Sequence, residues 1–299
     1  MKRSKFYAKI LAVAICTMAL SGCGSGKQDT PASTPAVSTA ITQETSASAT
    51  PETTQTAAPS STQAPAEELK WDTDTLKNDS GKTLIRCIGD QRNGDRHVSF
   101  GIVSSKGTTI LTDPIYSLKD KVYIKADVIT VTHTHSDHFN WMLLNKVKDY
   151  AKISSYSPES FTVNDVNVIG AAASHTSDPI NESRPSNTIY VYELDGLRIA
   201  HMGDMGQDEL TPEQLKKLGQ LDIIFTIITN APSYGSATEK NIKIIQQLKP
   251  KIVIPTHYAD DVLSETIKAL GVKEVERAPE LAVSKDDLKD ASMRFIIVE

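Results

Sequence analysis

Four side chains of the kinds that bind metal ions fall within residues 133–138, which read His-Thr-His-Ser-Asp-His. Imidazole nitrogens and carboxylate oxygens together suit zinc, iron or manganese. A polar loop with surface histidines is the ordinary alternative, but four such side chains in six residues are far denser than chance. The motif therefore predicts a metal centre, provided that the fold supplies further ligands from elsewhere in the chain.

The elements on either side of this motif must position its side chains. Residues 126–131 are apolar and mostly β-branched, which predicts a short buried strand. If extended backbone continues past this strand, His133, His135 and Asp137 project to one side, because side chains alternate along a strand. His138 follows without a spacer, so it must come from a turn or the start of a helix. An apolar stripe over residues 139–150 predicts that helix, with its positive end towards an anion at the metal.

The motif resembles that of the metallo-β-lactamase superfamily, and the chain is most similar to its branch of metal-dependent hydrolases related to ascorbate-6-phosphate lactonase. The resemblance covers roughly Thr83 to the C-terminus. It implies an α/β fold, the four-layer αβ/βα sandwich. Alternating strand and helix patterns over that part of the chain agree with this architecture. They include a hairpin turning at Asp195-Gly196 and a helix that opens at Thr211-Pro212.

The resemblance also implies a dinuclear metal site whose ligands follow several strands. One metal ion would be held by His133, His135 and His175, and the other by Asp137, His138 and His257. Asp204, in a Gly-Asp pair, would bridge the two ions, and Gly203 would permit close approach of the backbone. Asp137 and Asp204 are also the candidate catalytic residues. The expected cofactors are two divalent ions, Zn²⁺ first, with Mn²⁺ or Fe²⁺ as alternatives.

Residues around this set have less certain roles in the sequence. Asp113 is expected to support the metal-binding loop, although Asp113-Pro114 also reads as a simple turn. Tyr258 and Asn230 are expected at the pocket, and Asn230-Ala231 departs from the Gly-Gly pair of many relatives. His201 could support the site or pack, and His97 is expected to be structural or exposed.

The N-terminus carries a predicted secretion signal. Residues 1–22 combine a basic start with a short apolar core, which is typical of a secretory signal. Leu20-Ser21-Gly22-Cys23 resembles a bacterial lipobox, so we expect Cys23 to be lipidated; an ordinary signal peptide is the alternative. Residues 23–78 are predicted to be a disordered tether rich in Ser, Thr, Pro and Ala, and residues 79–299 a hydrolase domain. The expected location is extracytoplasmic, with a lipid anchor in the bacterial cell membrane.

Charge and cysteine content narrow the class of protein. The formal net charge is −5, and removal of residues 1–22, which hold four basic and no acidic residues, makes it −9. This acidity argues against nucleic acid as a partner. Of the three cysteines, Cys87 alone belongs to the predicted domain, so we expect a small core residue and no disulfide there.

Together these observations predict a surface-anchored enzyme, a metal-dependent hydrolase. A metal-bound hydroxide would attack a small lactone, ester or phosphodiester. The absence of a cysteine near Asp204 disfavours zinc β-lactamases that use a cysteine ligand. The alternative is a non-catalytic, metal-retaining module that binds a small ligand, and a third reading, an inert tether, conflicts with the complete ligand set. The sequence indicates neither the substrate nor the oligomeric state.

Overall fold

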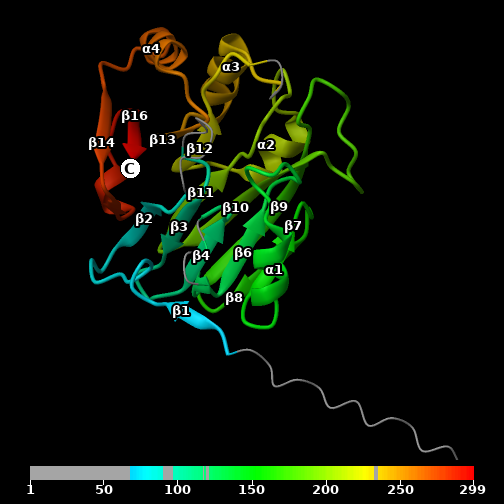
Figure 1. Cartoon of the computed structure of the whole chain (residues 1–299). Helices are drawn as coiled ribbons and strands as arrows, with labels where there is room; N and C mark the ends of the chain where they lie inside the picture. Colours follow the sequence, from blue (N-terminus) through cyan, green and yellow to red (C-terminus); the bar gives the residue numbers. More distant parts are fainter. Residues whose placement is uncertain (1–67, 90–96, 117, 119–120, 232–234) are drawn as a thin grey trace, which may run out of the picture. The chain divides into compact units, whose positions relative to one another are not determined.

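The computed structural model describes residues 68–89, 97–116, 118, 121–231 and 235–299 (Figure 1). The predicted signal peptide, Cys23 and the tether up to residue 67 lie outside these residues and stay predictions. Within the described part of the chain, no helix combines the length and the apolar content needed to cross a membrane.

Two mixed β-sheets form the centre of the domain. The six-stranded sheet has the order β15-β2-β3-β4-β6-β7, with strands β15 (Leu281–Val283), β2 (Thr83–Cys87), β3 (Phe100–Val103), β4 (Thr109–Thr112), β6 (Val128–Val131) and β7 (Lys152–Ser155). The eight-stranded sheet has the order β14-β16-β13-β12-β11-β10-β9-β8. Its strands are β14 (Val275–Ala278), β16 (Arg294–Val298), β13 (Ile252–Thr256), β12 (Ile223–Ile227), β11 (Leu197–His201), β10 (Asn187–Leu194), β9 (Val166–Ala173) and β8 (Ser160–Val163).

Three apolar clusters fill the spaces between the layers. One joins the facing sides of the two sheets, where the rings of Phe100 and Phe225 lie 4.5 Å apart. The second packs the eight-stranded sheet against α2 (Pro212–Leu218), α3 (Thr238–Leu248) and α4 (Asp260–Ala269). The third packs the six-stranded sheet against α1 (Trp141–Val147). Figure 1 shows α1 on the six-stranded sheet and α2–α4 with the eight-stranded sheet. This arrangement confirms the predicted αβ/βα sandwich.

The start of α2 shows how local sequence positions an element. Thr211 is its N-cap and accepts a hydrogen bond from the Gln214 amide at 3.2 Å, while the Gln214 side chain accepts one from the Thr211 amide at 2.9 Å. This reciprocal capping box satisfies two backbone donors that a helix start would otherwise leave unpaired. The predicted helix start is therefore confirmed.

Helix α1 differs from its prediction. It begins at Trp141, and the Asn140 side chain accepts from the Leu143 amide and caps it. The predicted helix is therefore confirmed over part of residues 139–150, but it begins three residues after His138 rather than beside it, and only seven residues are helical.

The folded domain also begins before residue 79. The short strand β1 (Lys70–Asp72) pairs in parallel with β5 (Val122–Ile124), and the Trp71 ring contacts Tyr123 and Tyr150. The predicted tether boundary at 78 is therefore too late. The sequence missed β1 and β5 because each has three residues and no clear alternation.

His97 and Cys87 lie side by side at the edge of the inter-sheet core. His97 is buried, and its ring stacks on Tyr258 with centroids 5.5 Å apart, which confirms the structural reading. Cys87 is a free cysteine that packs against the inter-sheet core, and its Sγ lies 3.3 Å from His97 Nδ1. Burial raises the pKa of this thiol, so it is a neutral packing residue.

The inter-sheet cluster should dominate stability. Phe225 is fully buried between the Phe100 ring and the His201 ring, so Phe225→Ala should lower the free energy of unfolding by about 3–5 kcal/mol. Urea denaturation of metal-free protein measures this change. The control Met142→Ala removes a side chain that is 58% exposed and should stay within about 0.5 kcal/mol of the parent; equal losses for both would contradict the layer assignment.

Candidate metal centre

The predicted ligands follow strands that end at one edge of the two sheets. His133 and His135 follow β6, and His175 follows β9. Asp204 follows β11, and His257 directly follows β13. Because β9, β11 and β13 run in the same direction, their carboxyl ends share an edge. The structure thus brings together residues that are up to 124 positions apart in the sequence, from His133 to His257.

A turn divides the motif between two groups of ligands. The amides of His138 and Phe139 both donate to the His135 carbonyl, at 3.0 and 2.8 Å, so the chain leaves the extended conformation there. The expectation that His133, His135 and Asp137 project to one side is therefore wrong. The expectation that His138 comes from a turn is confirmed.

The donor atoms gather in two groups in which all lie within 4.8 Å of one another. The first group is His133, His135, His175 and Asp204, and the second is Asp137, His138 and His257. These are the seven residues expected as ligands, and Asp204, expected between the two ions, is grouped with the first three histidines.

The Asp204 carboxylate lies between the two groups. Its Oδ2 is 3.4 Å from His175 Nε2 and 3.7 Å from His133 Nε2. Its Oδ1 is 3.4 Å from His138 Nε2 and 3.5 Å from His257 Nε2. Each oxygen therefore serves one group, which is the geometry expected of a bridging ligand.

Several buried nitrogen and oxygen atoms in this cluster lack hydrogen-bond partners. They are His133 Nε2, His175 Nε2 and both carboxylate oxygens of Asp204. Buried polar atoms are normally paired, so such a group needs an explanation. In addition, His138 Nε2 and His257 Nε2 face each other at 2.9 Å. The five imidazoles and two carboxylates fit divalent zinc, manganese or iron, which would satisfy these atoms.

The electrostatics of the cluster favour positive charge at its centre. Burial by itself would raise the pKa of Asp204. His138 and the neighbouring imidazoles outweigh that effect and hold this pKa well below its ordinary value. Burial lowers the pKa of His138, but Asp204 and Asp113 raise it well above its ordinary value. Burial and the nearby His138 lower the pKa of His133 to about 3. His133 is therefore neutral near pH 7, as a metal ligand must be.

Asp113 supports the second group from behind. It is fully buried, and its Oδ2 lies 2.7 Å from His138 Nδ1. It also accepts hydrogen bonds from the amide and hydroxyl of Thr132, each at 2.7 Å. A carboxylate on the far nitrogen of a histidine fixes the orientation and tautomer of the ring. This is the position that was predicted for Asp113.

Asn187 has a comparable function for Asp204, and the sequence did not indicate it. Its Nδ2 donates to the Met202 carbonyl at 2.8 Å, at the end of β11. Gly203 has a φ of +59°, and a Cβ there would lie 2.2 Å from Asn187 Oδ1. The predicted close approach at Gly203 is therefore confirmed, and Asn187 is the group that approaches.

Lys240 on α3 ties together the segments that carry His175 and Asp204. Its ammonium donates to Ser177 Oγ at 2.9 Å, to the Gly206 carbonyl at 3.0 Å and to the Gly235 carbonyl at 3.2 Å. It also lies 3.0 Å from Asp208 Oδ1. No sequence signal marks this residue, because a lysine on an amphipathic helix ordinarily faces solvent.

The remaining predicted residues lie near the cluster with different contacts. His201 is buried, its ring packs on Phe225, and its Nδ1 accepts from the Gly203 amide at 3.2 Å. Tyr258 is buried in the helix-side core, where it stacks on His97 and its hydroxyl interacts with Arg277; its expected place at the pocket stays a prediction. Asn230 is exposed in the loop after β12.

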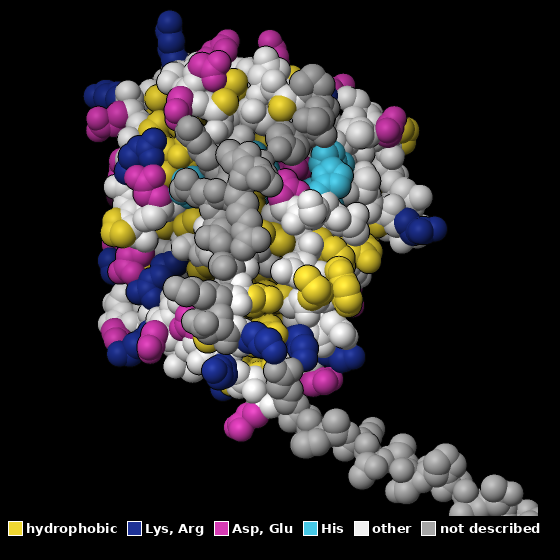
Figure 2. Space-filling model, in the orientation of Figure 1, with side chains coloured by type: hydrophobic (Ala, Val, Ile, Leu, Met, Phe, Trp, Pro, Cys, Tyr) yellow, Lys and Arg dark blue, Asp and Glu magenta, His cyan; other side chains and the backbone are white. Residues whose placement is uncertain are grey.

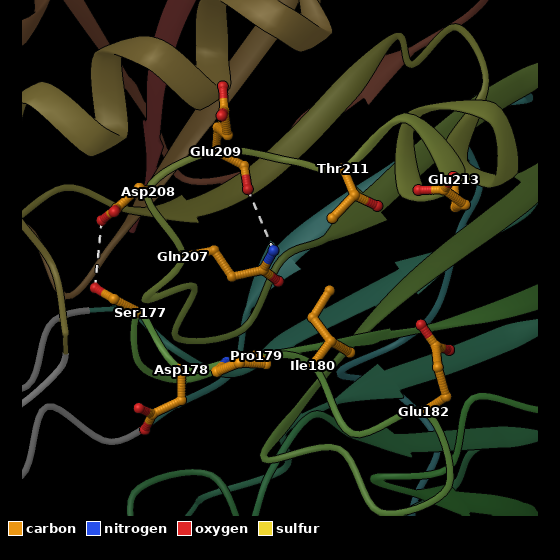
Figure 3. Close-up of a pocket in the computed structure, with 10 residues that line it drawn as sticks. All are labelled: Ser177, Asp178, Pro179, Ile180, Glu182, Gln207, Asp208, Glu209, Thr211 and Glu213. Atoms are coloured by element: carbon orange, nitrogen blue, oxygen red, sulfur yellow. Dashed lines mark hydrogen bonds between the residues drawn. The ribbon is translucent and has the colours of Figure 1, made fainter.

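A cavity of about 530 Å³ lies beside the loops that follow His175 and Asp204 (Figure 3). Its lining residues are Ser177, Asp178, Pro179, Ile180, Glu182, Gln207, Asp208, Glu209, Thr211 and Glu213. Five of these residues are acidic and none is basic. Gln207 closes one side, because its amide binds the Glu209 carbonyl, the Gln214 side chain and the Ser174 amide.

The contacts of Lys240 generate a prediction for metal affinity. Lys240→Met keeps the aliphatic stem but releases the two ligand-bearing segments, so the dissociation constant for Zn²⁺ should rise about tenfold, as for other residues that orient ligands. Competition with a chromogenic chelator measures it. Lys243→Met is the matched control, because Lys243 pairs with Glu209 in solvent. Equal effects of the two substitutions would refute the positioning role.

Comparison with known proteins agrees with this geometry. Residues 96–257 match the family model of the beta-lactamase superfamily domain. A UPF0173 metal-dependent hydrolase from Thermococcus onnurineus is 29% identical over 189 residues, which are 54% of this chain and 81% of the relative. A second one, from Pyrococcus furiosus, is 27% identical over 187 residues, with the same shares of both chains.

A solved structure shows the same fold. It is that of a candidate Zn-dependent hydrolase of the metallo-β-lactamase superfamily from Thermotoga maritima, with 22% identity and a TM-score of 0.51, and the similarity covers 73% of this chain and all of the other. The family match spans more than half of the residues and includes six of the seven clustered ligands before it ends on the seventh, His257. The chain therefore belongs to the β-lactamase superfamily, as a metal-dependent hydrolase.

Proposed function

We propose that this protein is a dinuclear hydrolase that acts on a small ester or lactone. The observation that carries the proposal is the Asp204 carboxylate, with one oxygen towards each ligand group. Two divalent ions held by these residues would lower the pKa of a water molecule and stabilise the charge that develops on the reacting oxygen.

The residues of the chain provide orientation and access. Asp113 and Asn187 hold His138 and the end of β11 in place, which limits the reorganisation needed during reaction. His135 is exposed and Asp137 is partly exposed, so a small substrate can reach the cluster from solvent. A protein nucleophile is not required, and the Cys87 thiol, whose pKa burial raises, contacts His97.

The charge around the cluster favours small acyl substrates. The neighbouring cavity is lined by five carboxylates, of which Asp208 and Glu209 pair with lysines; the other acidic side chains would repel a polyphosphate or nucleic acid. This supports an ester or lactone over a phosphodiester. The changed loop at Asn230-Ala231 motivates the alternative, a non-catalytic module that retains metal and binds a small ligand.

Metal content and turnover test the dinuclear site. The wild type should hold about two divalent ions per chain. His257→Ala should retain the ion at the first group and lose the other, whereas Asp204→Ala should weaken both. Both variants should lose at least about 100-fold in rate on an ester and lactone panel. Elemental analysis and initial rates give these values, and occupancy should fall at acid pH because ligand histidines take up protons.

The outcomes separate the two candidate functions. A His257→Ala variant with full activity would reject the two-metal mechanism while leaving the fold unaffected. A wild type with two bound ions and no hydrolysis on a panel of esters, lactones, amides and phosphodiesters would favour the binding module.

We further propose that the domain is attached to the outer side of the cytoplasmic membrane through Cys23. The support is the lipobox-like sequence Leu20-Ser21-Gly22-Cys23 and the low-complexity stretch that follows it. Cys23→Ala should release the protein from membranes or leave it unprocessed. Membrane fractionation and the mass of the N-terminus test this, and unchanged partition with normal processing would reject the anchor.

A further inference from the structure

The exposed large hydrophobic side chains of the described residues all belong to one segment. They are Trp141, Met142, Tyr150 and Tyr156, with exposed fractions of 63, 58, 57 and 43%. Single exposed apolar residues are ordinary, but several gathered on one surface indicate a binding site. The segment that carries them starts three residues after the ligand His138.

Strand register places Tyr156 at the same sheet edge as the metal cluster. Strands β6 and β7 are parallel, with Val131 opposite Ser155, so Tyr156 lies level with the residue that precedes His133. The Tyr156 amide also donates to the Val131 carbonyl at 2.6 Å. Phe139 follows His138, and the centroid of its ring lies 6.3 Å from the centroid of the Tyr156 ring. Figure 2 shows hydrophobic side chains gathered on the same face as an exposed histidine.

Folding alone does not account for these side chains. Helix α1 packs on its sheet through Leu143, Leu144 and Val147, so Trp141 and Met142 remain outside that contact. Tyr156 has a φ of +40°, a conformation that is costly for a bulky residue and is found mostly where function requires it. Tyr150 differs, because its ring lies 4.9 Å from Trp71 and helps to hold β1.

We propose that Trp141, Met142 and Tyr156 form an apolar shelf that binds the hydrophobic acyl group of the substrate. This rests on the proposed hydrolase function and narrows its substrates to esters or lactones with an apolar chain or ring. Because Tyr156 lies at the same sheet edge as the metal ligands, an acyl group on the shelf would bring its carbonyl carbon towards the cluster. The segment that carries the shelf has both signs of charge, with Lys146 and Lys148 beside Asp149 in the sequence and an ion pair between Lys152 and Glu159, which favours a neutral apolar group over an anionic lipid surface.

Chain-length dependence of hydrolysis tests the shelf. With zinc-loaded full-length protein, kcat/KM for p-nitrophenyl esters should rise from acetate to hexanoate, by up to about fourfold per added methylene. The double variant Met142→Ser, Tyr156→Ser should flatten this dependence while it keeps its metal content. Tyr150→Ser, the matched control, should keep the dependence. A flat dependence in the wild type, or one that survives the double substitution, would overturn the proposal.

A binding measurement separates this proposal from the hydrolase function. The chain has two tryptophans, so Trp71→Phe leaves Trp141 as the sole tryptophan, which can be excited selectively at about 295 nm, beyond tyrosine absorption. Hexanoate should shift the Trp141 emission of the zinc-loaded protein to the blue, acetate should not, and the Met142→Ser, Tyr156→Ser background should abolish the shift. Hexanoate binding without ester hydrolysis would reject the hydrolase function and retain the shelf. Ester hydrolysis without a hexanoate-induced shift would retain the hydrolase function and reject the shelf. Partition onto phosphatidylcholine vesicles gives a further test. If the protein partitions without metal and the double substitution abolishes this partition, the shelf is a membrane-binding site and not a substrate site.

Discussion

The buried carboxylate of Asp204 is the constraint around which the domain is organised. A carboxylate without hydrogen-bond partners is expensive to bury unless positive charge is close to both of its oxygens. The surrounding imidazoles can supply this charge themselves when protonated, or deliver it by holding divalent ions. Asp204 and Asp113 raise the pKa of His138 well above its ordinary value, which reflects the same preference for positive charge.

Meeting that constraint requires unusual backbone around the cluster. Asp113 and His257 both have positive φ, at 45° and 42°, where residues other than glycine are costly to place. Gly206 and Gly235 pack so closely on the His175 carbonyl that a Cβ would lie 2.0 and 2.3 Å from its oxygen. Burial of the two-sheet core stabilises the fold enough to offset the free-energy cost of this strained backbone.

Substrate selection depends on surfaces that are independent of the ligand set. The loops after His175 and Asp204 line a cavity with carboxylates, and the segment after His138 presents aromatic and thioether side chains. Because the fold accommodates many chemistries, such differences around a common metal cluster separate one relative from another. This is why resemblance to a lactonase branch does not by itself identify the substrate of this chain.

The sequence by itself determined what depends on local signals. The dense motif at 133–138, the capping box at Thr211 and the hairpin around Asp195-Gly196 each act over a few residues, and each was predicted from the pattern. Resemblance to a family supplied His175, Asp204 and His257, which composition and spacing could not have joined. Only the tertiary structure decided the rest. The hold of Lys240 on two loops and the pairing of β1 with β5 both depend on hydrogen bonds between distant segments. Such bonds form only when the packed sheets bring those segments together, so the local pattern of residues carries no trace of them.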